Sequence, residues 1–182
     1  GRVDWTDQSG DLLKTANVFE NDTDQDQEIR AVSTRTAYPD ATVNYSIYLL
    51  NEDAKNPEDG ELLCEQTATY PYRGFHREKL DTPVEVKDGQ KISVVVTEQE
   101  KDDARKDQYS YVVVTSNSKK YAEENGFPSY GVPVMHEGES FVYKDGEWTD
   151  WTDGLPKYIK EKELSDDYVM ENFSIKTYMV PK

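Results

Sequence analysis

The sequence predicts an all-β fold, an antiparallel two-sheet β-sandwich of jelly-roll-like type with one or two short helices. Three observations predict it. Several segments alternate between apolar and polar residues, two further runs are rich in β-branched residues, and Gly, Pro and Asp punctuate the intervals. The chain has 182 residues, which is enough for one ordinary hydrophobic core. We therefore expect a single domain over residues 1–182, cut from a longer protein.

The strands follow from these patterns in order along the chain. Residues 43–49 predict a half-buried strand, because apolar and polar side chains alternate over the whole segment. The β-branched runs at 91–97 and 109–115 predict central strands. Shorter strands are expected at residues 16–19, 28–34, 62–67, 77–80, 140–143 and 173–178.

Turn and helix signals fill the intervals. Asp88-Gly89 and Asp145-Gly146 are favoured hairpin dipeptides, and residues 56–60 form a turn or loop. A short helix is expected over 118–125, with Ser118 as its N-cap and Gly126 directly after its end. The charged segment 157–169 is expected to be a loop with a helical turn.

Charge and composition exclude several classes of function. The chain carries 21 Lys and Arg against 37 Asp and Glu, a net charge of −16. This charge opposes the phosphate attraction of nucleic-acid binding and disfavours anionic membrane surfaces. No apolar run approaches the roughly 20 residues of a membrane span, so membrane insertion is not expected. The 13 Tyr, 3 Trp and 5 Phe argue against a disordered chain.

An enzyme is hard to assemble from this sequence. Cys64 is the single cysteine, so no intrachain disulfide forms, and its apolar neighbours suggest that it packs as a small hydrophobe. A nucleophilic cysteine would need a base, and only His76 and His136 are available. No Gly-x-Ser-x-Gly or phosphate-loop motif occurs. We therefore expect no catalytic residues in this chain.

A hairpin over residues 139–151 carries the most informative aromatic residues. Trp faces stack on the C–H faces of sugar rings, and neighbouring carboxylates accept hydrogen bonds from sugar hydroxyls. Trp148 and Trp151 are therefore candidate platforms, with Asp145 and Asp150 as acceptors. A straight strand would put the two Trp on opposite faces, one in the core and one exposed; the alternative is that both rings pack in the core or at its rim. Tyr72, in an aromatic loop shaped by Pro and Gly, is a further stacking candidate or a ring covering the turn.

An acidic run offers oxygen ligands for a hard cation. Asp22, Asp24 and Asp26 stand at alternate positions, as at the start of an EF-hand loop. The EF-hand pattern then fails, because Gln27 replaces the required Gly and Ser33 replaces the closing Glu. A different calcium site completed by a distant carboxylate and a solvated acidic turn are the two alternatives.

Seven sequence blocks in order carry a family resemblance. They are residues 16–19, 28–33, 45–48, 74–76 with 80–84, 88–96, 137–141 with 145–148, and 172–176. On these blocks the chain resembles the lectin-like β-sandwich domain found downstream of papain-type (C1 family) cysteine peptidases in secreted or surface proteins of Gram-positive bacteria. The resemblance implies a jelly-roll-like sandwich, a secreted or cell-surface location, and an adjacent peptidase domain in the same polypeptide.

Two functions of different class follow. The first is a non-catalytic extracellular or cell-surface module that binds carbohydrate through the residues named above. The second is an accessory module without a sugar site, which positions the neighbouring peptidase or docks another surface protein. A concave aromatic surface would favour the first, and an exposed apolar patch rimmed by charge would favour the second. A glycoside hydrolase is a distant third, because 37 acids make a carboxylate pair uninformative.

Overall fold

The computed structural model describes residues 2–6, 14–99, 108–112, 116–127 and 133–182. Its main layer is a six-stranded antiparallel sheet with the strand order β11-β10-β2-β7-β4-β5. The bounds in that order are Glu147–Asp150, Ser140–Lys144, Lys14–Glu20, Lys91–Gln99, Ala41–Leu50 and Gly60–Tyr70.

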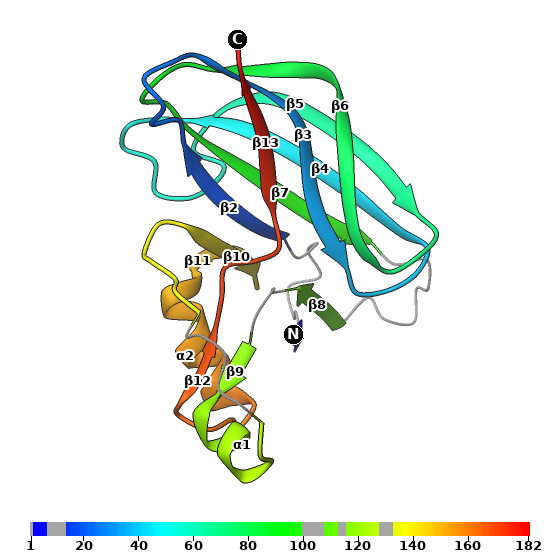
Figure 1. Cartoon of the computed structure of the whole chain (residues 1–182), viewed down its shortest axis with the longest axis vertical. Helices are drawn as coiled ribbons and strands as arrows, with labels where there is room; N and C mark the ends of the chain where they lie inside the picture. Colours follow the sequence, from blue (N-terminus) through cyan, green and yellow to red (C-terminus); the bar gives the residue numbers. More distant parts are fainter. Residues whose placement is uncertain (1, 7–13, 100–107, 113–115, 128–132) are drawn as a thin grey trace.

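The second layer is a three-stranded antiparallel sheet with the order β13-β3-β6. Its strands are Lys176–Pro181, Gln27–Thr36 and Gly74–Val86. In Figure 1 the strands of this sheet cross over those of the larger one, as expected for two stacked layers. The prediction of an antiparallel two-sheet sandwich is confirmed.

The hydrophobic core lies between the two sheets. Val43, Tyr45 and Ile47 of β4 point inward and are essentially fully buried, and Ile29 and Val32 of β3 are buried in the same cluster. The alternation seen in residues 43–49 therefore has its expected cause, since every second side chain of a strand faces the same layer.

Two short strand pairs flank the sandwich. β1 (Arg2–Thr6) pairs with β8 (Gln108–Val112), and β9 (Ser116–Ser118) pairs with β12 (Tyr168–Met170). The run 91–97 lies within β7, which is a central strand as predicted. The run 109–115 was expected to be central as well, and this is wrong for its described part, because β8 belongs to the two-stranded sheet. Residues 113–115 lie outside the described residues.

The predicted short helix is confirmed as α1 (Lys119–Glu124). The Ser118 side chain accepts a hydrogen bond from the Tyr121 N–H, which is the N-cap contact that the sequence indicated. Gly126 follows the helix with a φ of +67°, in the left-handed region that glycine adopts without strain.

A second helix, α2 (Trp151–Glu161), begins six residues before the charged segment where only a helical turn was expected. Its internal Pro156 hid it, because proline is disfavoured inside helices. Asp150 caps the helix by accepting the Thr152 N–H at 2.9 Å. Three buried side chains one turn apart, Trp151, Leu155 and Tyr158, fix the helix to the core.

Figure 1 shows α1, α2, β9 and β12 together at one end of the molecule, with the C-terminus at the other. The β10–β11 hairpin leads from the sandwich into α2. Across the described part of the chain, no helix combines the length and the apolar character that a membrane crossing needs.

Candidate functional site

The candidate site is the face of the six-stranded sheet that points away from the core, called here the outer face. Strand register aligns its side chains in rows, since directly paired residues of antiparallel strands share a face. Tyr143 of β10 pairs with Lys14 of β2, which pairs with Thr97 of β7, which pairs with Asn44 of β4. Trp148 of β11 extends this row beyond Tyr143. Further members of this face are Ala16, Thr42, Ser46, Thr67, Thr69, Ser93, Val95 and Phe141.

The aromatic end of the outer face is built by Tyr143 and Trp148. Their rings meet edge to face, with centroids 5.4 Å apart and planes at 62°. The Lys14 ammonium lies 4.8 Å from the Tyr143 ring centroid and 5.9 Å from that of Trp148. The contacts hold both rings in fixed orientations while each residue stays only partly buried.

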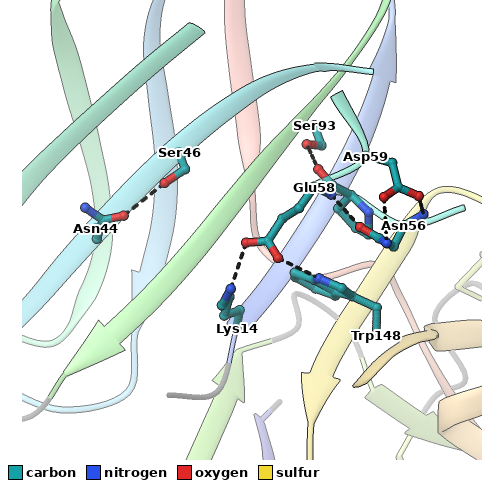
Figure 2. A network of polar contacts seen from close by, with 9 residues as sticks. Lys14, Asn44, Ser46, Asn56, Glu58, Asp59, Ser93 and Trp148 are labelled. Carbon is teal, nitrogen blue, oxygen red and sulfur yellow. Dashed lines mark hydrogen bonds and ion pairs between the residues drawn. The ribbon is translucent and has the colours of Figure 1, made fainter. Parts of the chain in front are cut away.

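Glu58 ties the two ends of this cluster together. Its Oε2 accepts a 2.9 Å hydrogen bond from the Trp148 Nε1–H, and its Oε1 accepts one of 2.7 Å from the Lys14 ammonium. Figure 2 shows the carboxylate of Glu58 between Lys14 and the indole of Trp148. An indole whose N–H is held in this way cannot swing freely, so its orientation is set before a ligand arrives.

The loop that carries Glu58, residues 51–59, is itself fixed. The Asp59 carboxylate accepts the Lys55 and Asn56 N–H groups at 2.7 and 3.1 Å, and the Asn56 side chain accepts the Glu58 N–H at 2.8 Å. The Ser93 hydroxyl, on the outer face, donates to the carbonyl of Pro57. These bonds lay the loop against β7 and aim Glu58 at the aromatic pair (Figure 2).

The rest of the outer face is mixed, because the register puts the apolar Ala16, Val95 and Phe141 on it beside polar side chains of β4 and β5. Asn44 donates to the Thr67 hydroxyl at 3.1 Å, and the Ser46 hydroxyl donates to the Asn44 side-chain oxygen at 3.1 Å. The hydroxyls of Thr42 and Thr69 lie 3.2 Å apart. Hydroxyls and amides are the groups that exchange hydrogen bonds with sugar hydroxyls, so the chemistry of this face suits a polyol ligand.

Trp151 does not reach the outer face, and its prediction as a stacking platform is wrong. Its side chain is 0% exposed. The ring packs against Trp5, Tyr158 and Phe173, with centroid distances of 6.3, 6.3 and 5.1 Å. The strand does not continue through Trp151, because the chain turns into α2 there and the ring enters the core.

The other predicted sugar ligands are spread over separate places. Tyr72 is 77% exposed, but it follows β5, at the edge of the sheet opposite to β11. Five strand spacings of about 4.8 Å put Tyr72 roughly 24 Å from Trp148, too far for one sugar ring to touch both. Asp145 lies in the β10–β11 turn and pairs with Lys144. Asp150 is engaged as the cap of α2, and its second oxygen accepts the Gly138 N–H at 2.6 Å.

The acidic run does not assemble the calcium site that was considered. Asp22, Asp24 and Asp26 are exposed in the turn between β2 and β3. Hydrogen bonds hold this turn against Asp88 instead. The Asp88 carboxylate accepts the Asp24 backbone N–H at 3.0 Å, and the Asp26 carboxylate accepts the Asp88 backbone N–H at 3.3 Å. Among the described residues, no three His, Cys, Asp or Glu side chains gather closely enough to hold a metal ion.

A polar cluster links the two sheets at the β5–β6 end. The Tyr70 hydroxyl donates to Glu78 at 2.9 Å and lies 3.0 Å from the Tyr45 hydroxyl, and its ring stacks on His76 with centroids 3.9 Å apart. Burial raises the pKa of Tyr70 to about 12 and lowers the pKa of His76. The His76 ring contacts Thr36 at 3.1 Å. The cluster therefore connects the six-stranded sheet to the three-stranded sheet within the molecule.

Cys64 lies on β5 and is partly buried. Burial raises the pKa of its thiol, which keeps the thiol protonated and weakens it as a nucleophile. The expectation that Cys64 packs as a small hydrophobe fits its position against the core cluster.

Glu58 and Lys14 were not found from the sequence. Glu58 lies 90 residues from Trp148 along the chain and Lys14 lies 44 residues from Glu58, so no local spacing connects them. The turn chemistry of residues 56–60 indicated the loop, but not the side of the sheet that it covers.

The fold defines a two-sheet β-sandwich module. A family model described as "Lectin like domain" matches residues 2–178, and the chain belongs to that family. This confirms the resemblance stated above. No curated protein sequence matches the chain.

Two solved structures share the fold. One contains the cysteine protease and lectin-like domains of Cwp84, a surface layer associated protein of Clostridium difficile, at a TM-score of 0.59 and 14% identity. The other is an alanine variant of clostridial cysteine protease Cwp84 after propeptide cleavage, at a TM-score of 0.63 and 14% identity. Each match covers 100% of this chain but only 36% and 38% of those chains, so this chain spans little more than a third of their length.

Proposed function

We propose that this chain is a non-catalytic, cell-surface lectin-like module that binds carbohydrate on its outer face. The observation that carries the proposal is the pair of oriented rings, Tyr143 and Trp148, beside a row of amides and hydroxyls on one sheet surface. An aromatic platform with fixed polar partners is the usual way for a protein to recognise a sugar, because the rings cover C–H faces and the polar groups replace water.

The electrostatics of the outer face favour a neutral sugar. Glu58 is neutralised by Lys14, so the cluster presents no unpaired charge of its own around Trp148. A bound hydroxyl would share the Glu58 carboxylate with the indole N–H and the ammonium, since a carboxylate has about four acceptor positions. Trp148, Tyr143, Lys14 and Glu58 are the proposed binding residues.

The setting of the module is proposed from its relatives. Both Cwp84 structures carry the lectin-like fold together with a cysteine protease, and one is described as surface layer associated. We infer that this chain sits beside a peptidase domain in one extracellular polypeptide. We infer that the role of this chain beside the peptidase is to bind a ligand. Burial raises the pKa of the partly buried Cys64 thiol and so weakens it as a nucleophile, which agrees with a binding role.

A glycan-array screen of the purified domain tests the proposal. The wild-type protein is compared with Trp148→Ala and with Tyr121→Ala, a matched aromatic truncation on α1 where the ring is 61% exposed. Binding of one sugar class by wild type and Tyr121→Ala, lost in Trp148→Ala, is the expected result. Equal binding by all three proteins would remove the outer face as the site.

A second function has one observation in its favour. Tyr121 and Phe127 are 61% and 60% exposed and stack with centroids 6.4 Å apart, and Val134 is 63% exposed. Exposed apolar side chains of this size are typical of protein interfaces. If the wild-type domain binds no glycan, an accessory module that positions the peptidase becomes the better account, and Tyr121 and Phe127 are the first residues to substitute.

A further inference from the structure

The face of the three-stranded sheet that points away from the core is unusually basic. Arg35 of β3, Arg77 and Lys79 of β6, and Lys176 of β13 all lie on it and are exposed. Phe75 and Tyr178 share the same face. These six residues are called the basic face. Buried Ser33 and Ala31 form its floor, because Arg77 and Lys176 pair with Ser33, and Lys79 and Tyr178 pair with Ala31.

The basic face stands out against the charge of the whole chain. The net charge is −16, yet the paired positions of this face between Ala31 and Arg35 carry four cations and no acid, while the pair Glu28 and Glu85 lies further along the same face. Glu78, between Arg77 and Lys79, points to the other side, where it binds Tyr70 and Gln66. Within the described residues, none of the four cations has a carboxylate within 4.0 Å.

The acids of this sheet lie elsewhere. Glu28 pairs with Arg30 at 2.8 Å, and Glu85 pairs with Lys182, both toward the far end of the same strands. Asp81 follows Lys79 on β6, beyond the point where the register with β3 breaks. Within the described part of the chain, the four cations are therefore available to an anionic partner.

The stacking of Arg77 decides which kind of anion fits. Its guanidinium lies over the Tyr178 ring, 4.3 Å from the centroid. The ring face is thereby occupied and cannot serve as a sugar platform. A guanidinium edge suits a carboxylate, which takes two parallel hydrogen bonds from it.

We propose that the basic face docks an acidic polypeptide segment in an extended conformation, with Asp or Glu at alternate positions. Arg77 and Lys79 are two residues apart on one strand, about 6.7 Å, and alternate side chains of an extended partner repeat at the same distance. Phe75, 51% exposed, supplies an apolar anchor at one end. Arg, Tyr and Phe are the residue types enriched at protein interfaces. The proposal does not depend on the sugar site, which lies on the other sheet.

The test uses a fluorescent peptide of alternating Glu and Thr, with an alternating Gln and Thr peptide as the neutral control. Fluorescence anisotropy is measured on the wild-type domain and on the double variant Arg77→Glu with Lys79→Glu. The matched control is Lys55→Glu with Lys87→Glu, two exposed lysines elsewhere that give the same change in net charge. Thermal unfolding confirms that all three proteins fold.

Saturable binding of the Glu-Thr peptide that weakens by at least about tenfold in the Arg77/Lys79 variant and by less than about twofold in the control is the expected result. Equal weakening in both variants would overturn the proposal, since it would reflect net charge alone. So would no binding by the wild type, or binding of the sulfated polysaccharide heparin without binding of the peptide.

Discussion

The indole Nε1–H of Trp148 donates a 2.9 Å hydrogen bond to Oε2 of Glu58, 90 residues earlier in the chain. This bond joins the β10–β11 hairpin, at one edge of the six-stranded sheet, to the loop between β4 and β5, at the other edge. It also gives Trp148 a fixed orientation while the residue remains partly exposed. A fixed and accessible indole is what distinguishes Trp148 from Trp5 and Trp151, which are 7% and 0% exposed.

Glu58→Ala is expected to release Trp148. The variant loses the acceptor for both the indole N–H and the Lys14 ammonium, and we expect a loss of about 1 kcal/mol in the free energy of unfolding. Quenching of tryptophan fluorescence by acrylamide should increase. Glu52→Ala, an exposed acid in the same loop, is the control and should change neither quantity. Identical quenching in wild type and Glu58→Ala would show that this bond does not restrain the ring.

Trp151→Ala is expected to cost stability. Removing a fully buried ring that packs on three aromatic neighbours should lower the free energy of unfolding by about 3–5 kcal/mol. Trp148→Ala should cost less than about 2 kcal/mol, because the ring is only partly buried. Urea denaturation of both variants provides the measurement, and a reversed order would contradict the assignment of Trp151 to the core.

Gly154→Ala is expected to destabilise α2 although alanine is the better helix former. A Cβ at position 154 would lie 2.9 Å from Cε3 of the buried Trp151 ring. The ring cannot move away, so the clash should outweigh the gain of up to about 1 kcal/mol from helix propensity. Lys157→Ala on the exposed side of α2 should stay within about 0.5 kcal/mol of wild type. A Gly154→Ala protein with a higher melting temperature would refute this packing.

Asp167 is expected to make the stability of the fold decrease at acidic pH. Hydrogen bonds from the Ser165 hydroxyl, the Lys120 N–H and the Ser118 hydroxyl lower the pKa of Asp167 to about 2. Because the folded pKa lies below the unfolded one of about 3.9, its contribution to stability is complete near neutral pH and is lost as the pH falls toward 2. NMR titration of the Asp167 carboxyl carbon checks this, and a midpoint near 4 would contradict it. Asp167→Asn should lose stability at neutral pH and show a shallower fall in acid.

Calcium is expected to leave stability unchanged. Asp22, Asp24 and Asp26 are exposed and do not gather around one point, and a bound ion would need them to do so. Melting curves with calcium and with EDTA should superimpose. A higher melting temperature with calcium, abolished in Asp24→Asn, would restore the metal site, since a ligand that binds the folded state stabilises it.

The fold was predictable because its evidence is local. Alternation in residues 43–49 and the β-branched run at 91–97 reflect a core that buries every second side chain, and both lie in strands of the main sheet. Ser118 and Gly126 bracket α1 for equally local reasons, a cap at one end and a left-handed glycine at the other. The lectin-like resemblance likewise rested on blocks that prove to be scaffold.

The candidate site was only partly predictable. Trp148 was named from its hairpin, but Trp151 was placed by an alternation that stops where Asp150 starts a helix. Tyr72 and Trp148 look equivalent in the sequence, and only the strand order shows that they lie at opposite edges of the sheet. Glu58 carries no signal at all, because its role depends on a contact across 90 residues.

The most direct test of the proposed sugar site is a crystal structure of the domain with the glycan that the array identifies. We predict electron density for a sugar ring against Trp148 and Tyr143 on the outer face, with a hydroxyl in hydrogen-bond distance of Glu58. Density beside Tyr72 or on the basic face, with the outer face empty, would contradict the account.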